Sequence, residues 1–331
     1  MSSPLDLHAA AAVDSVDADE AGVADTRTDA VEAVVPGACP GCEGTRFRSR
    51  VVADGLVTFT CESCGLILSS MNRRKPKMGQ YANVDLRAYL SSVGVLRQEQ
   101  SSAILSFLRP HAPRAARVLD VGCGFGSFLV QAREAGYGVA GVEPDADACA
   151  GACKILGEGA VKQGTLHDVR PPAGSADVVT TLDVLEHVPV GDQGTFAALV
   201  TNALSPGGLW LIKVPSTEGL YYKVSALMAR VAPAIGTTLM RRLWQTDYEF
   251  PHTMYFDRSS LRIWLRRHGF TLIAYRYLPE VPTRTIIDRL THDGDISRTL
   301  AYAMVPAVYV INAIEWLRGR SDALVVVARC N

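Results

Sequence analysis

Short apolar runs alternate with amphipathic segments along the chain from about residue 117 onward. The apolar runs predict strands at residues 118–121, 138–142, 176–181, 209–214, 271–277 and 323–328. The amphipathic segments predict helices at residues 93–108, 128–135, 146–156, 195–204 and 259–267. Strands that alternate with helices favour a parallel sheet with helices on both faces, which is an α/β class of fold.

Two longer segments, at residues 216–254 and 279–321, interrupt this alternation with largely apolar helical runs. Insertions at the strand ends of an open sheet commonly cover the ligand crevice, so we expect both to form a helical cap. The longest apolar stretch, 300–316, contains Pro306 and Asn312 and is short for a membrane span. We therefore expect a buried or cap helix there, with a helix at a membrane surface as the alternative.

The N-terminal part of the chain differs in composition from the rest. Residues 1–35 are acidic and alanine-rich, and they lack the basic and apolar segments of an export signal. Because few bulky apolar side chains are present, we expect a disordered tail. Residues 36–70 then form a small module, residues 71–92 a basic and turn-rich linker, and residues 93–331 the α/β domain with its caps.

Composition limits the classes of protein to consider. A chain of 331 residues with 48% hydrophobic and 20% charged residues is typical of a folded protein with one large domain and a small module. The net charge of −1 gives no reason to expect binding to nucleic acid. Because no export signal is evident, we expect a cytoplasmic location, no transmembrane segment and no disulfide framework.

Four of the cysteines have the spacing of metal ligands. Cys39 and Cys42 form one C-x2-C pair, and Cys61 and Cys64 form the second. Two such pairs on tight turns are typical of a zinc ribbon, in which four thiolates bind Zn²⁺ and leave no position for a substrate. We therefore predict a structural zinc ion that stabilises a module too small to fold alone. Two redox dithiols or four unligated cysteines are the alternatives.

A glycine turn follows the first predicted strand of the α/β domain. Gly122, Gly124 and Gly126 allow the backbone to turn tightly and to approach a ligand closely. The spacing is G-x-G-x-G rather than the G-x-G-x-x-G of dinucleotide sites. Asp120 would repel a pyrophosphate but suits an ammonium group, and Glu143 at the end of the second strand suits two ribose hydroxyls. Together these features indicate an adenosyl ligand with an amino-acid tail.

The segment at residues 176–189 contains Asp183, which is followed by the run Val-Leu-Glu-His-Val with Glu186 and His187. With the glycine turn, it resembles the class I S-adenosylmethionine (SAM)-dependent methyltransferase superfamily, specifically the bacterial group with a "VLEHV" signature, over about residues 115–278. The resemblance implies a Rossmann-like, doubly wound, mostly parallel seven-stranded sheet whose last strand is antiparallel. It also implies these SAM-binding residues: Asp120, Gly122, Gly124, Phe125, Gly126, Glu143, Pro144, Leu166, Asp168 and Asp183.

The order of the segments also carries information. An N-terminal ribbon with two cysteine pairs, a methyltransferase core and the run at residues 251–256 resemble enzymes of bacterial natural-product and surface-polysaccharide pathways. Within this layout His187, His252 and Tyr255 are the candidate catalytic residues. Histidine suits a general base because its pKa lies near neutrality. A purely structural role for each histidine, and simple packing for Tyr255, are the alternatives.

These observations lead to a functional hypothesis. We expect methyl transfer from SAM to an oxygen or carbon of a small-molecule, sugar or lipid-like acceptor in bacterial secondary-metabolite or cell-surface glycan biosynthesis. The apolar cap favours an apolar or lipid-linked acceptor and leaves membrane-surface contact open. The alternatives are a methyltransferase that uses the ribbon to recognise tRNA or protein, and a non-catalytic scaffold. The acceptor, the methylated atom and the oligomeric state stay open.

Overall fold

The computed structural model describes residues 36–331 apart from residues 54, 74–85, 249, 282–285 and 292–296, with backbone only at 72–73, 86–96 and 288–289. The predicted tail at residues 1–35 and most of the predicted linker at 71–92 lie outside the described residues. Within that linker range, helix α1 (Leu86–Leu108) already begins at Leu86, seven residues before the predicted start at 93.

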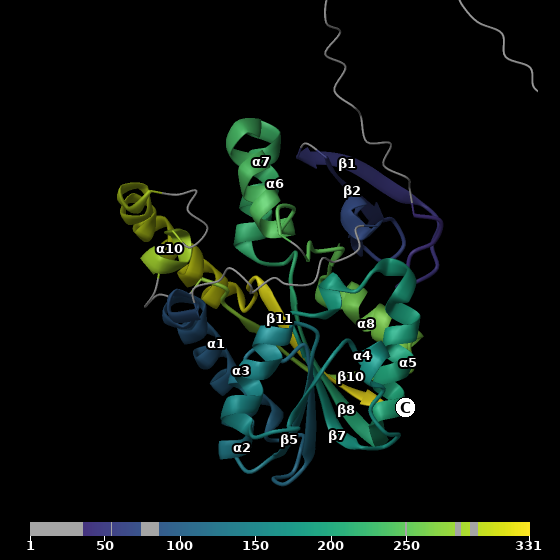
Figure 1. Cartoon of the computed structure of the whole chain (residues 1–331). Coiled ribbons are helices and arrows are strands. Elements are labelled where there is room, and N and C mark those ends of the chain that lie inside the picture. Colours follow the sequence, from purple (N-terminus) through teal and green to yellow (C-terminus); the bar gives the residue numbers. More distant parts are fainter. Residues whose placement is uncertain (1–35, 54, 74–85, 249, 282–285, 292–296) are drawn as a thin grey trace, which may run out of the picture. The chain divides into compact units, whose positions relative to one another are not determined.

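A seven-stranded sheet forms the centre of the α/β part, with the strand order β10-β11-β8-β7-β4-β5-β6 (Figure 1). Its strands are β4 (Arg117–Val121), β5 (Gly138–Glu143), β6 (Val161–Gln163), β7 (Ala176–Leu182), β8 (Leu204–Pro215), β10 (Phe270–Leu278) and β11 (Ala323–Cys330). The pairs among β4, β5, β6, β7 and β8 are parallel, whereas β11 is antiparallel to both β8 and β10. The predicted fold class, with an antiparallel last strand, is confirmed.

Helices cover both faces of this sheet. Helices α1, α2 (Ser127–Glu134) and α3 (Ala146–Leu156) lie on one face, and α4 (Leu166–Val169), α5 (Gln193–Ala203) and α8 (Arg258–Arg267) lie on the other (Figure 1). Successive residues of β11 show the consequence: Val325 packs in the core on the α1–α3 side, and Val326 packs in the core on the α5 and α8 side. Parallel strands covered on both faces are apolar throughout, which explains their continuous apolar runs.

The ribbon has its own antiparallel sheet, which includes a strand from the α/β part. Strands β1 (Phe47–Ala53), β2 (Leu56–Cys61) and β3 (Ile67–Ser69) are followed by a 3₁₀ turn, η1 (Ser70–Arg73). The fourth strand is β9 (Met254–Tyr255), which pairs with β3. Leu68 of β3 and Met254 are fully buried in the same core. Strand β9 was not predicted, because two residues are too few for a periodic pattern.

The described residues of the two insertions, which were predicted to form a cap, contain four helices. Helices α6 (Leu220–Val231) and α7 (Pro233–Trp244) come from the first insertion, and α9 (Ile286–Thr291) and α10 (Arg298–Arg318) from the second. The first two pack so closely that a Cβ atom on Gly236 would lie 2.0 Å from the backbone nitrogen of Ala229. This close approach requires glycine at position 236.

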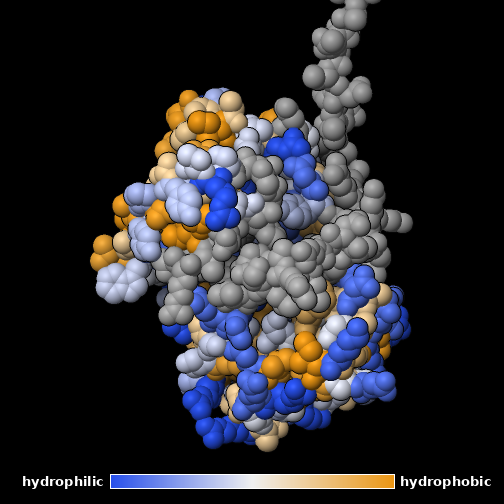
Figure 2. All heavy atoms as spheres, turned by 60° about the vertical axis from the view of Figure 1, so that its left-hand side comes forward, coloured by the Kyte–Doolittle hydropathy of each residue, from blue (hydrophilic) through white to orange (hydrophobic). Residues whose placement is uncertain are grey.

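A buried or cap helix was predicted at residues 300–316, and helix α10 exposes most of its apolar side chains. Its buried residues are Ala301, Val308 and Glu315, whereas Trp316 and Leu317 are 81% and 75% exposed. Apolar side chains gather on the outer surface of the cap (Figure 2). Among the described residues, α10 is the one helix long and apolar enough to cross a membrane by length and composition, and 17% of its apolar window is buried.

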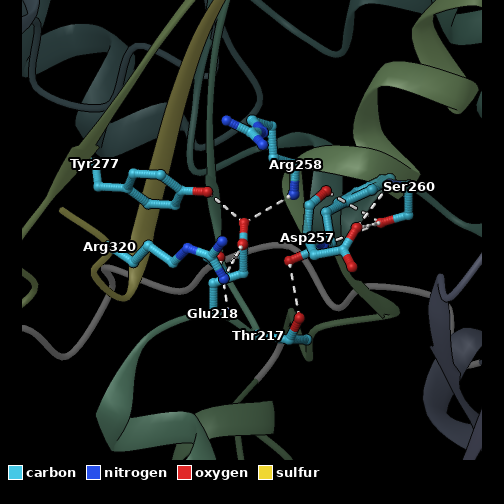
Figure 3. A network of polar contacts seen from close by, with 9 residues as sticks. Thr217, Glu218, Asp257, Arg258, Ser260, Tyr277 and Arg320 are labelled. Atoms are coloured by element: carbon cyan, nitrogen blue, oxygen red, sulfur yellow. Dashed lines mark hydrogen bonds and ion pairs between the residues drawn. The ribbon is translucent and has the colours of Figure 1, made fainter. Parts of the chain in front are cut away.

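A polar network joins the end of β8 to its neighbours (Figure 3). The carboxylate of Glu218 accepts hydrogen bonds from the hydroxyl of Tyr277 on β10 and from the backbone nitrogen of Arg258, which begins α8. Arg320, just before β11, lies 3.2 Å from the same carboxylate. Glu218 therefore connects elements that are far apart in the sequence and fixes the end of β8, beyond which the cap begins.

Candidate active site

A cavity of about 1240 Å³ opens at the carboxyl ends of the central parallel strands, beneath the cap helices. Residues from the ends of β4, β5, β7 and β8 line it, together with residues of α6, α7 and α10. A crevice at these strand ends is the usual ligand site of an open α/β sheet.

The glycine turn forms one wall of this cavity. Gly122 has a φ of +73°, and a Cβ atom there would lie 2.6 Å from the side chain of Val184, so no other residue fits. Gly124 has a φ of +55°, and its backbone nitrogen donates a hydrogen bond of 2.7 Å to Glu143. Phe125 also lines the cavity. Gly126 is absent from the lining: it precedes α2, and a Cβ atom there would lie 2.9 Å from Leu156.

Asp120 lies inside the sheet at the cavity wall and is 2% exposed. It pairs with Thr180 of the neighbouring strand, and the hydroxyl of Thr180 donates a hydrogen bond of 2.5 Å to its carboxylate. Burial raises the pKa of Asp120 to about 7, and the charge of Glu143 adds to this shift, while the Thr180 hydrogen bond and Arg97 oppose it. A cationic group of a ligand would favour the ionised carboxylate.

Glu143 ends β5 and is 5% exposed. One carboxylate oxygen accepts from Gly124, and the other accepts a hydrogen bond of 2.9 Å from the backbone nitrogen of Asp145. Burial raises the pKa of Glu143, and these two hydrogen bonds act in the opposite direction. The two backbone donors fix the direction of the carboxylate at the cavity wall, next to Pro144.

Of the two SAM-binding residues predicted near α4, Leu166 and Asp168, only the first lies in the cavity lining. Leu166 is buried and lines the cavity. Asp168 is absent from the cavity lining, because its carboxylate accepts hydrogen bonds from the backbone nitrogen and hydroxyl of Thr165 at 2.9 and 2.6 Å. Asp168 thus caps the short helix α4, a role consistent with its sequence position three residues after Thr165.

Asp183 lines the cavity beside a buried lysine that the sequence analysis missed. The ammonium of Lys213 lies 2.7 Å from Asp183 and 2.7 Å from Glu280, and its side chain is 3% exposed. Burial alone would lower the pKa of Lys213, but the two carboxylates raise it to about 12. A single lysine in the apolar strand β8 was the signal that could have revealed this cluster.

The two candidate histidines face each other in the cavity. His187 ends the 3₁₀ turn η2 (Leu185–His187), and His252 precedes β9. Their ring centroids are 4.9 Å apart, and both residues line the cavity. Burial lowers the pKa of His187 and lowers that of His252 well below its ordinary value. Both rings are therefore neutral at neutral pH.

Tyr255 lines the cavity beside His252 and is 3% exposed. Its ring packs against Tyr222 and Trp244, with centroids 4.9 and 4.6 Å away. Its hydroxyl donates a hydrogen bond of 2.7 Å to the carbonyl of Leu243 and lies 3.3 Å from Nδ1 of His252. Because this hydrogen is already donated, the geometry favours orientation of His252 over donation to a substrate.

The four cysteines of the ribbon converge. Each pair brackets a tight turn in which Glu43 and Gly65 donate hydrogen bonds of 2.9 Å to the carbonyls of the first cysteine. The Sγ atoms of Cys39 and Cys64 are 3.5 Å apart, as are those of Cys42 and Cys61, and all four lie within 4.8 Å of one another. Tetrahedral Zn–S bonds of about 2.3 Å place sulfurs about 3.8 Å apart, so the cluster fits a zinc ion.

Comparisons with known proteins agree with this geometry. The methyltransferase domain family matches residues 96–275. A ubiquinone biosynthesis O-methyltransferase from Nitrosococcus oceani is 34% identical over 186 residues, which span 51% of this chain and 69% of that protein. One from Xanthomonas axonopodis pv. citri is 28% identical over 230 residues, or 66% and 85% of the two chains. A match to a Caulobacter relative spans only 39% of that relative's length.

A solved structure shows the same fold. A chain from the complex of the Haloferax volcanii Trm112 methyltransferase activator with a methyltransferase is 16% identical, with a TM-score of 0.50 over 76% of this chain and 97% of that chain. The protein belongs to the methyltransferase domain family. It is a SAM-dependent methyltransferase. Its place in the "VLEHV" group stays a prediction, as do the roles of the individual cavity residues.

Proposed function

We propose that this enzyme transfers the methyl group of SAM to a hydroxyl oxygen of a small, largely apolar acceptor. The observation that carries the proposal is a single cavity in which Asp120 and Glu143 lie near the glycine turn and His187 and His252 face each other. The curated relatives named as ubiquinone biosynthesis O-methyltransferases support oxygen as the methylated atom. Methylation of carbon is the alternative outcome of a product analysis.

The donor end of the cavity fits the chemistry of SAM. We assign the ammonium group to Asp120, the ribose hydroxyls to Glu143, and the adenine to the side of Leu166. When bound, SAM supplies a methyl group on a cationic sulfur, which is a strong electrophile. The turn at Gly124 leaves room for the ligand, since no atom lies within 4 Å of a Cβ placed there. Gly122, Phe125, Pro144 and Asp183 complete the donor side of this proposal.

The histidine pair provides the proton acceptor. As the oxygen of the acceptor forms its bond to the methyl carbon, the carbon–sulfur bond breaks and its electron pair stays on sulfur, which yields S-adenosylhomocysteine. The hydroxyl proton passes to His187 or His252, both of which are neutral at neutral pH because burial lowers each pKa. We propose that Tyr255 positions His252 through the contact of 3.3 Å.

The cap gives the acceptor end of the cavity its apolar character. It contributes, among others, Tyr222, Leu239, Leu243, Met304, Val308 and Ile311. These side chains support a lipid-like acceptor, and the exposed apolar residues of α10 support contact with a membrane surface (Figure 2). A role in bacterial secondary-metabolite or glycan biosynthesis belongs to this proposal on the strength of the domain order alone, and the cytoplasmic location stays a prediction.

We propose that the cysteine cluster binds one structural Zn²⁺. The separations between the sulfurs support this assignment, and four thiolates leave no coordination position for an acceptor. The alternative of a ribbon that recognises tRNA or protein predicts binding that weakens with salt. The net charge of −1 offers that alternative no support.

Calorimetry with two ligands tests the donor site. S-adenosylhomocysteine carries the amino-acid tail, and methylthioadenosine lacks it. We expect Asp120→Asn to weaken the binding of S-adenosylhomocysteine only, and Glu143→Gln to weaken that of both ligands. Asp177→Asn, which alters an acid outside the cavity lining, is the matched control and leaves both unchanged. Equal losses for the two ligands in Asp120→Asn would contradict the assignment.

A further inference from the structure

We propose that Glu186, His187 and His252 bind a divalent metal ion at the acceptor end of the cavity, separate from the cysteine cluster. One ligand atom from each of these residues lies within 4.8 Å of the other two. All three residues line the cavity. They come from two segments that are far apart in the sequence, the turn after β7 and the approach to β9. Two imidazoles and one carboxylate are a common ligand set for transition metals.

The hydrogen bonds of the two rings fix their tautomers. Nδ1 of His187 lies 3.3 Å from the carbonyl of Pro251, which can only accept, so this nitrogen carries the hydrogen. Tyr255 donates its one hydroxyl hydrogen to Leu243, so its oxygen accepts from Nδ1 of His252. In these tautomers Nε2 of each ring is the nitrogen that can bind a metal ion, although the backbone of Phe250 and of Leu243 also contacts the rings of His187 and His252, respectively. Metal-binding histidines typically donate their other N–H to a carbonyl or similar acceptor, as both rings do here.

The carboxylate of Glu186 supplies the second, independent observation. Glu186 is 1% exposed, and its Oε2 atom has no hydrogen-bond partner among the residues that the structure describes. A buried carboxylate oxygen without a partner is unfavourable, and a cation is the partner that would satisfy it.

Backbone contacts hold the ligands in register. The carbonyl of Glu186 accepts hydrogen bonds of 2.7 and 2.9 Å from the backbone nitrogen and the hydroxyl of Thr253. The same hydroxyl lies 3.0 Å from the carbonyl of Val188. Thr253 directly follows His252. Its hydrogen bonds therefore hold the segment that carries His252 at a fixed distance from the turn that carries Glu186 and His187. Thr253 is thus a positioning residue for the proposed site.

The ligand set favours Zn²⁺ or Fe²⁺ with an open coordination position. Ligands at about 2.0–2.1 Å in a tetrahedral site lie about 3.3 Å apart, so the three side chains must rotate toward one another when they bind the ion. Three protein ligands leave a fourth position toward the cavity, unlike the closed cysteine cluster. We expect Zn²⁺ as the first occupant, because neutral imidazoles and a carboxylate form the known three-ligand zinc sites.

The chemical role of this metal ion rests on the proposed methyl transfer, in which the ion would activate the hydroxyl of the acceptor. The hydroxyl of the acceptor would bind the ion, which lowers the pKa of that hydroxyl and releases its proton to water. The oxygen then forms its bond to the methyl carbon as the carbon–sulfur bond breaks, with the electron pair left on sulfur. This changes one step of the proposed function: with the ion bound, His187 and His252 are its ligands, and the proton passes to water instead of to one of these histidines.

Metal binding by the full-length chain tests the site without any assay of activity. The probe is Co²⁺, whose thiolate charge-transfer bands report the cysteine cluster and are absent from a site of histidine and carboxylate. We expect the wild type to bind a further equivalent of Co²⁺ or Zn²⁺ beyond the cysteine-bound ion. Glu186→Gln and His252→Gln should each lose that equivalent and keep the thiolate bands. Thr253→Val should weaken the binding of the further metal ion by about 10–100-fold.

His268→Gln is the matched control, because Nδ1 of His268 also contacts a carbonyl, that of Trp264 at 2.8 Å, outside the cavity lining. Binding of S-adenosylhomocysteine, measured in every variant, shows that each one folds. A wild-type protein with cysteine-bound metal only would overturn the metal site and leave the histidines as the base. A bound second ion without binding of S-adenosylhomocysteine would support the metal site and contradict the proposed methyl transfer.

Discussion

The hydroxyl of Ser69 donates a hydrogen bond of 2.9 Å to the backbone carbonyl of His252. Ser69 is fully buried, and its backbone nitrogen donates a second bond of 2.9 Å to the carbonyl of Thr253. Ser69 ends β3, which begins three residues after Cys64. The cysteine cluster is thereby connected, through one short strand, to the segment that brings His252 into the cavity.

Replacement of Ser69 by alanine tests this connection. It removes the partner of a buried carbonyl, so we expect a loss of about 1–3 kcal/mol in the free energy of unfolding. Because the contact positions His252, we also expect kcat to fall while the affinity for S-adenosylhomocysteine stays unchanged. Ser70→Ala is the control, since Ser70 bonds to Val57 and Gly55 within the ribbon. An equal fall of kcat in both variants would show that the contact with His252 has no special role.

Removal of zinc should loosen β9. We expect a chelator, or Cys42→Ser, to accelerate hydrogen exchange at the amide of Thr253, which donates to Glu186. Exchange in β5, on the far side of the sheet, serves as the internal control. Unchanged exchange at Thr253 after the loss of zinc would mean that the ribbon does not stabilise the site.

The affinity for S-adenosylhomocysteine should rise with pH. Burial raises the pKa of Asp120 to about 7, and an ammonium group binds only the ionised carboxylate. Below this pKa we expect about a tenfold gain in affinity per pH unit, with a plateau above it. For the ligand-free protein the sign is opposite: the contribution of Asp120 to stability is present below its ordinary carboxyl pKa and is lost as the pH rises through about 7.

Calorimetry across about pH 5.5–8.5 measures this dependence. Thr180→Val should move the midpoint upward, because it removes the hydrogen bond that favours the ionised form. In Asp120→Asn the affinity for S-adenosylhomocysteine should depend little on pH, and any dependence that remains comes from the titration of Glu143. A wild-type affinity that is independent of pH over this range would argue against Asp120 as the partner of the ammonium group.

Lys213 should matter more for stability than an exposed basic residue in a similar pair. Lys213→Met leaves Asp183 and Glu280 without their shared cation, and removal of one partner from a buried pair costs about 3–5 kcal/mol. Arg117→Met breaks the exposed pair with Asp177, which we expect to cost much less because solvent screens an exposed pair. Urea denaturation compares the two variants. Similar losses would show that the buried cluster is not a stabilising feature.

The elements that were predicted best from the sequence are those whose structure depends on residues close together in the chain. The strand that ends at Val121, the glycine turn and the following helix depend on neighbouring residues, and α3 (Ala146–Leu156) has the predicted bounds. Contacts between distant segments had no local signal. Pairing of β3 with β9, and the approach of Glu280 to Lys213, arise only when the sheet and cap are assembled. The exposure of α10 likewise depends on its packing, because composition alone favours burial of such a helix.

A crystal structure with bound S-adenosylhomocysteine tests the central claim most directly. The account predicts the amino group of the ligand within hydrogen-bond distance of Asp120, both ribose hydroxyls at Glu143, and the sulfur on the side of the cavity that holds His187 and His252. A ligand seated elsewhere, or a ribose turned away from Glu143, would contradict the assignment of the donor site and the acceptor chemistry built on it.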